Sequence, residues 1–119
     1  MILLKATTET LELLTSSTAD VDYSISYADI TTTTFSPSTS EGKIVTATTP
    51  TVLSAPAAST QRQIKLITIA NRHASTSNNV TIKKDISGTE YYLTPTITLL
   101  AGESMQYMDG QGWIYYSVT

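Results

Sequence analysis

The sequence contains no cysteine, one histidine and few charged residues. Without cysteine the chain can form neither a disulfide framework nor a thiolate metal site, so its stability depends on packing or on assembly. Charged residues make up 14% of the 119 residues, whereas soluble domains average about 25%. A formal net charge of -3 argues against nucleic acid as the main ligand, because phosphate binding needs a concentrated basic face. A surface with few ions favours protein contacts, since few charges lose their water when a partner docks.

Long apolar runs are also missing. Residues 1–5 are mostly apolar but form a shorter stretch than a signal-peptide core, and no later run is long enough to cross a bilayer. We therefore expect a soluble product that is made in a cytoplasm and contacts no membrane.

Residues suited to catalysis or metal binding are sparse. His73 lies in a polar segment with no nucleophile beside it, which favours a solvent-facing turn residue over a general base. Asp20 and Asp22 stand two positions apart, as calcium ligands sometimes do, but no carboxylate cluster or loop glycine completes a cage. We expect no enzyme activity, no catalytic residue, no metal ion and no cofactor.

Serine and threonine, in contrast, make up roughly a third of the chain, with runs at residues 31–34 and 46–51. Short hydroxyl side chains compete for backbone hydrogen bonds and disfavour helix, while β-branched threonine fits a pleated strand. The composition predicts a nearly all-β chain.

Strict alternation of polar and apolar residues over 10–14 and 21–27 predicts two half-buried strands. Residues 63–70 are apolar on both faces, which is typical of a central strand covered on both sides. Strict alternation would place Ile64 and Leu66 on one face, and Ile67 and Ile69 on the other. We expect this strand to pair antiparallel with residues 80–85.

Two segments in the first half lack a strand pattern. Residues 31–42 are polar, contain Pro37 and have only Phe35 as an apolar anchor, so we expect an exposed loop. Residues 44–58 contain Pro50 and Pro56, and predict either two short strands or an extended arm along a neighbouring subunit.

Several further short strands follow, separated by glycine-containing turns. At spacings of roughly eight to twelve residues they predict a sandwich or barrel of antiparallel strands. The length suits one hydrophobic core. We therefore predict one domain over residues 1–119, a single antiparallel β-sandwich of jelly-roll-like form with extended N-terminal and middle segments.

Charges and aromatic residues are unevenly distributed. Five of the seven basic residues lie between residues 62 and 84, while five acidic residues lie in the first third. These charges either line solvated edges or match between neighbouring subunits. Six aromatic residues fall within 91–116, where Tyr115 and Tyr116 must face opposite sides of one strand. Such rings pack in a core, stack on sugars or anchor a protein interface.

Six segments of the chain form a recognisable pattern: residues 11–20 (LELLTSSTAD), 54–63 (SAPAASTQRQ), 69–76 (IANRHAST), 80–89 (VTIKKDISGT), 100–107 (LAGESMQY) and 109–113 (DGQGW). In these segments the sequence resembles a group of small virion proteins of tailed bacteriophages. The resemblance covers most of the chain and implies a virion β-sandwich with a structural role, without assigning a role to any residue.

Two roles follow from this resemblance. The first is a capsid decoration or cement protein on the virion surface, binding the major capsid protein between capsomers as a homotrimer. The alternative is a tail, fibre or baseplate module that attaches an assembly or grips a host glycan. For the first role we expect the N-terminal strand and the segment 31–42 to face the shell and the 107–116 hairpin to contact another subunit. The expected interface residues are Leu3, Leu4, Phe35, Tyr107, Trp113, Tyr115 and Tyr116.

Overall fold

The computed structural model describes residues 1–118, which form eleven β-strands and no helix. The first sheet contains β1 (Ile2–Leu4), β3 (Val21–Ile30), β4 (Phe35–Ile44), β6 (Gln61–Asn71), β10 (Ser104–Met108) and β11 (Gly112–Tyr116). The second sheet contains β2 (Glu9–Thr15), β5 (Thr51–Leu53), β7 (Asn78–Ile86), β8 (Thr89–Tyr92) and β9 (Ile97–Leu99). The predicted all-β sandwich is confirmed.

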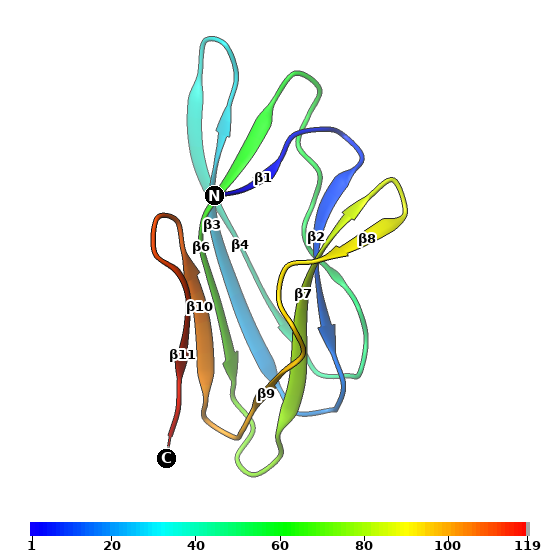
Figure 1. The fold of residues 1–119 in the computed structure, drawn as a ribbon, viewed down its shortest axis with the longest axis vertical. Coiled ribbons are helices and arrows are strands. Elements are labelled where there is room, and N and C mark those ends of the chain that lie inside the picture. Colours follow the sequence, from blue (N-terminus) through cyan, green and yellow to red (C-terminus); the bar gives the residue numbers. More distant parts are fainter. Residues whose placement is uncertain (119) are drawn as a thin grey trace.

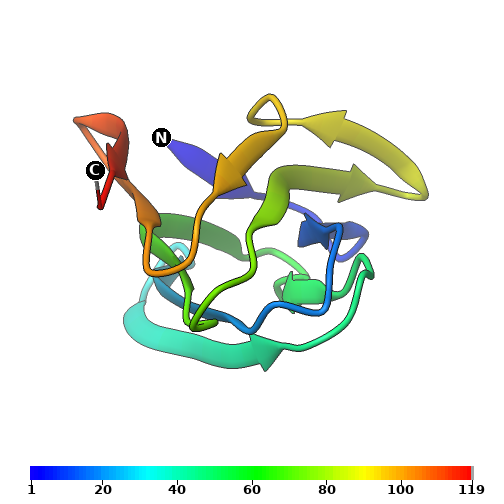
Figure 2. The same ribbon diagram turned by 90° about the horizontal axis from the view of Figure 1, so that it is seen from below.

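Every strand pair in the two sheets is antiparallel (Figure 1). The first sheet runs in the order β11-β10-β6-β3-β4, with β1 beside the other end of β6. The second runs β5-β2-β7-β8, with β9 beside the other end of β7. The view from below in Figure 2 shows the two layers, with the β7–β8 hairpin and the edge strand β4 on opposite sides of the molecule. No helix in residues 1–118 has the length and apolarity to cross a membrane.

Residues that alternate along the strands fill the core between the sheets. In β2, buried and half-buried residues alternate along the whole strand, as the sequence predicts. In β3, Val21 and Ile25 are fully buried. The core also includes Leu4 of β1, Ile82 of β7 and Met105 of β10, so both sheets and the N-terminal strand contribute to it.

A bulge in β6 changes which of its side chains face the core. Ser26 of β3 pairs with Leu66 and Tyr27 with Ile64, which leaves Lys65 as the extra residue. Ile64 and Ile67 are therefore both buried, while Leu66 is half-buried. The prediction of a strand with two covered faces is wrong. The bulge puts Ile64 on the same buried face as Ile67 and Ile69, whereas strict alternation would place it on the opposite face.

The predicted pairing of residues 63–70 with 80–85 is also wrong, since β6 and β7 belong to different sheets. The connection between them crosses from one sheet to the other and is held by two buried amides. The Nδ2 of Asn71 donates to the carbonyl of Leu99 at 2.9 Å, and the Nδ2 of Asn78 donates to the carbonyl of Ala19 at 3.0 Å.

Most of residues 31–42 form a strand and not the expected exposed loop. Residues 31–34 make a turn, and β4 then pairs with β3 over ten residues, although only Ile44 of β4 is buried. Pro37 is tolerated because β4 is an edge strand, which needs hydrogen-bond donors on one side only. Of residues 44–58, only the end of β4 and the short β5 are in strands.

Candidate binding site at the hairpin end

Three connections meet at the end of the sandwich where β3 turns into β4. They are the β1–β2 connection (residues 5–8), the β3–β4 turn (residues 31–34) and the β5–β6 connection (residues 54–60), shown at the top of Figure 1. We call this the hairpin end. Two surface hollows flank its central turn.

Threonine hydroxyls hold the β3–β4 turn in one conformation. The Oγ1 of Thr31 accepts the backbone N–H of Thr33 at 3.3 Å and that of Thr34 at 3.0 Å. It also shares a hydrogen bond of 2.7 Å with the hydroxyl of Thr34. Such hydroxyl-to-backbone bonds define compact turns, so the tip is pre-organised. Directly after it, Phe35 is 62% exposed.

An apolar groove of about 390 Å³ lies beside Phe35. Phe35 and Pro37 of β4 line it together with Lys65, the bulged residue of β6. Between them lie the small residues Ser26 and Ala28 of β3. Small residues flanked by larger ones produce this hollow, and an apolar side chain of a partner fits its chemistry.

A polar cleft of about 400 Å³ lies on the other flank of the turn. Its lining comes from all three connections and includes Lys5, Thr32 and Ser59, together with Gln61 at the start of β6. Ile30 at the end of β3 adds an apolar wall. Ser59 has a φ of 58°, the left-handed region that non-glycine residues rarely adopt. The cleft therefore combines one cation with several neutral hydrogen-bonding groups.

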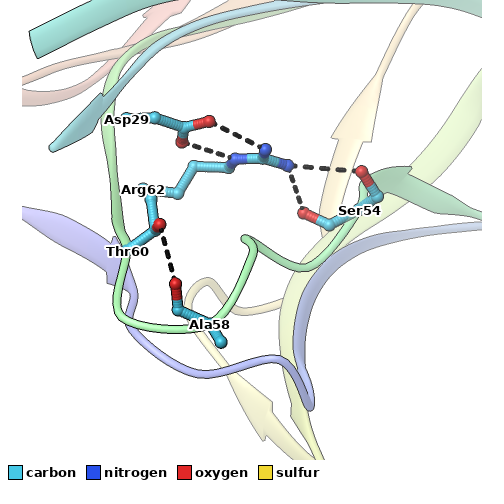
Figure 3. Close-up of polar contacts among 5 residues, drawn as sticks. All are labelled: Asp29, Ser54, Ala58, Thr60 and Arg62. Carbon is cyan, nitrogen blue, oxygen red and sulfur yellow. Dashed lines mark hydrogen bonds and ion pairs between the residues drawn. The ribbon is translucent and has the colours of Figure 1, made fainter. Parts of the chain in front are cut away.

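Arg62 fixes the β5–β6 connection that forms one wall of this cleft (Figure 3). Its guanidinium donates to both oxygens of Asp29, at 2.9 and 3.0 Å, and to the carbonyl of Ser54 at 2.7 Å. The hydrogen bond with Asp29 is the largest cause that raises the pKa of Arg62. Its Cζ also lies 4.6 Å from the centre of the Tyr27 ring. A bidentate, partly buried arginine is rigid, and here it ties the first sheet to the segment after β5.

Lys5 is the exception among the basic side chains of residues 1–118. The other six each have a carboxylate oxygen within 4.0 Å, in the pairs Lys43–Asp22, Arg62–Asp29, Lys65–Asp109, Arg72–Asp22, Lys83–Glu90 and Lys84–Glu9. Three of these pairs, those of Arg62, Arg72 and Lys84, join the basic middle of the chain to its acidic first third. The uneven charge distribution is thus largely matched inside one subunit.

The structure corrects two of the predicted interface residues. Leu4 is fully buried and Tyr107 is 6% exposed, so both belong to the core and offer no surface to a partner. Leu3 is half-buried, because it alternates with Leu4 in the short strand β1. Trp113 is also half-buried, and its ring centre lies 5.2 Å from that of Tyr107.

Tyr115 and Tyr116 are exposed at 45% and 47%, and within residues 1–118 only Tyr115 has a side-chain hydrogen bond. The hydroxyl of Tyr115 donates to Oε1 of the buried Glu103. Glu103 also accepts the backbone N–H of Leu100 at 2.9 Å and the hydroxyl of Ser117 at 3.1 Å. The carboxylate therefore clamps β11 to the turn before β10, a role that nothing in the sequence indicated.

A second exposed aromatic pair lies on the β7–β8 hairpin, which projects from the body in Figure 1. Tyr91 and Tyr92 of β8 are 51% and 64% exposed. The ammonium of Lys83 lies 5.4 Å from the centre of the Tyr92 ring and 2.5 Å from Glu90. These tyrosines are not among the predicted interface residues, although their place in the aromatic-rich last third of the chain is a signal for exposed rings.

A carboxylate cluster on the second sheet was also missed. Oxygens of Glu12, Asp85 and Glu90, from three adjacent strands, lie within 4.8 Å of one another. One oxygen of Glu12 is buried without a hydrogen-bond partner. Burial, followed by repulsion from Asp85 and Glu90, raises the pKa of Glu12. The spacing of carboxylates matches that of a cation site, but the Lys83 ammonium already supplies a cation beside Glu90.

The remaining candidates from the sequence have structural partners. The Nδ1 of His73 accepts the backbone N–H groups of Ser75 at 3.1 Å and Thr76 at 2.9 Å, which shapes the turn after β6. The carboxylates of Asp20 and Asp22 lie 3.8 and 3.2 Å from the ammonium of Lys43.

Comparison with known proteins adds no relative. No family model matches the chain, and neither a curated protein nor a solved structure matches it. The resemblance to tailed-phage virion proteins therefore stays a prediction.

Proposed function

We propose that this chain is a structural protein of a bacteriophage virion, a decoration or cement protein that binds the outer surface of the capsid between capsomers. In this proposal the major capsid protein is the partner, the bound form is a homotrimer and no catalytic step is involved. The observation that supports it most directly is the rigid hairpin tip that presents Phe35 at 62% exposure beside an apolar groove.

A pre-organised tip of this kind is suited to docking. An exposed aromatic residue on a fixed turn buries a large apolar area, and little conformational entropy is lost because the turn is already ordered. Arg62 adds to this rigidity by holding the neighbouring connection in place. A protein bound at many equivalent sites stabilises a shell by mass action, even when each contact is modest.

The test mixes purified protein with expanded, undecorated capsids and measures occupancy by electron microscopy. We expect the wild-type protein to occupy defined positions between capsomers and the variant Phe35→Ser to lose about tenfold or more in affinity. Val45→Ser is the matched control, because Val45 is 49% exposed but follows the other end of β4. Equal loss in both variants, or no binding by the wild type, would count against the proposal.

A tail or fibre role is the second candidate, and the polar cleft is the observation that favours it. A cleft of about 400 Å³ falls within the size range of small-molecule sites. Localisation distinguishes the two roles: an antibody against the protein labels the shell of intact virions in the first case and the tail in the second.

A further inference from the structure

The polar cleft at the hairpin end contains hydrogen-bonding groups that the fold does not use. Two hydroxyls hold the walls of the cleft. That of Thr31 accepts the backbone N–H of Thr34 within the turn, and that of Thr60 donates to the carbonyl of Ala58 at 3.2 Å. By contrast, the side chains of Thr32, Ser59 and Gln61 have no hydrogen-bond partner within residues 1–118.

The cation in this cleft makes no direct ion pair, although its charge attracts the Glu9 carboxylate at longer range. The ammonium of Lys5 has no carboxylate within 4.0 Å among the described residues, although its backbone is held in place. Its N–H donates to Glu9 Oε1 at 3.3 Å, and Glu9 is in turn paired with Lys84 at 2.9 Å. Lys5 therefore lines the cleft from a backbone position that is held in place.

The walls are fixed independently of any ligand. Arg62 anchors one connection through Asp29 and Ser54, and the Thr31 hydroxyl locks the opposite turn. A site whose walls are already ordered loses little entropy when it binds.

These groups together define a ligand class. A lysine ammonium pairs with a carboxylate, while neutral hydroxyls and an amide match the alcohol groups of a sugar ring. Ile30 offers an apolar wall to the C–H face of such a ring. A simple carboxylate would engage Lys5 but leave the neutral groups unused, and an uncharged sugar would leave Lys5 unused.

We infer that this cleft binds a carboxylate-bearing sugar residue, a hexuronate or a similar acidic monosaccharide within a glycan. The carboxylate pairs with Lys5, and the ring hydroxyls contact Thr32, Ser59 and Gln61. This inference does not depend on a capsid location, because it concerns a site on the isolated protein.

The experiment is a titration of the full-length, ¹⁵N-labelled protein at low ionic strength, followed by amide chemical shifts. The probes are D-glucuronate, D-glucose, acetate and the tripeptide Gly-Glu-Gly. We expect saturable shifts with glucuronate at residues 5, 30–32 and 59–61. We expect glucose, acetate and the tripeptide each to bind about tenfold more weakly, since each lacks either the charged or the hydroxyl contacts.

Two lysine variants test the role of the charge. Lys5→Gln should weaken glucuronate binding about tenfold, because it removes the charge-assisted hydrogen bond. Lys43→Gln is the control, because Lys43 is also an exposed lysine but lies near the other end of β4, and binding should stay unchanged.

Four results would overturn the inference. The first is the absence of saturable shifts with glucuronate. The second is equal binding of acetate or Gly-Glu-Gly, which would mean a general carboxylate contact. The third is equal binding of glucose, which would remove the role of the charge. The fourth is equal weakening by Lys5→Gln and Lys43→Gln, which would indicate a nonspecific effect of net charge.

Discussion

The ring of Tyr23 lies over the backbone of Gly42, its direct partner on the neighbouring strand. A Cβ at position 42 would come within 2.5 Å of the Tyr23 hydroxyl oxygen and 2.6 Å of its Cζ. An aromatic ring over a glycine covers the backbone that the missing side chain leaves open. Tyr23 packs against the core from this position, so the edge strand β4 is attached by more than its hydrogen bonds.

This contact predicts that Gly42→Ala destabilises the fold. The new methyl group must displace the ring, and we expect a loss of about 1–3 kcal/mol in the free energy of unfolding, measured by chemical denaturation. In a Tyr23→Ala background the same substitution should cost much less, because no ring is left to displace. Equal costs in the two backgrounds would contradict the contact.

The N-terminal strand is part of the core and not a free arm. Leu4 is fully buried, whereas Leu3, one position earlier, is half-buried. We predict that Leu4→Ala lowers the free energy of unfolding by about 2–4 kcal/mol. Leu3→Ala, the matched control, should cost under about 1 kcal/mol. Similar costs would mean that β1 is not packed as described.

The strands that the sequence could predict are those whose side chains sort between core and solvent. In β2 and β3 the alternation is visible because one face is buried. In β4 only Ile44 is buried, so a ten-residue strand carries no apolar pattern at all. The bulge at Lys65 was equally invisible, because it depends on the pairing with β3 and not on local composition.

The candidate site was harder to predict for a related reason. Its polar cleft collects Lys5, Thr32 and Ser59 from three connections that are far apart in the sequence. No spacing rule links such residues, because only the sandwich brings the connections together. Phe35 could be named from sequence as a lone apolar residue in a polar stretch, and it is exposed.

Glu12 gives a prediction about charge and pH. Its pKa is raised, first by burial and then by Asp85 and Glu90. With respect to this group, the fold is therefore most stable below the ordinary pKa of 4.5, where Glu12 is neutral. That stability is lost as the pH rises through the raised pKa and Glu12 becomes charged. Glu12→Gln should thus stabilise the protein at pH 7 by about 0.5–1 kcal/mol.

Thermal unfolding at several pH values checks this expectation. The gain from Glu12→Gln should shrink as the pH falls, because the wild-type carboxyl becomes neutral as well. A control is Glu41→Gln, since Glu41 is exposed and has no charged partner among residues 1–118. That variant should change stability little at any pH. A destabilised Glu12→Gln at pH 7 would contradict the prediction.

Glu103 should respond to pH in the opposite direction. The hydrogen bond from Tyr115 and then that from the Leu100 N–H lower its pKa. Its contribution to stability is present above the ordinary value of 4.5 and is lost as pH falls through the lowered pKa. Glu103→Gln should therefore be less stable than the wild type at pH 7, and the difference should close in acid.

Hydrogen exchange locates this effect in the molecule. Because Glu103 clamps β11, its replacement should speed amide exchange over residues 112–118, while amides of β2 and β7 change little at native conditions. Tyr115→Phe removes one donor and should have a smaller effect at the same amides. Uniformly faster exchange across both sheets would show that Glu103 supports the whole sandwich and not β11 alone.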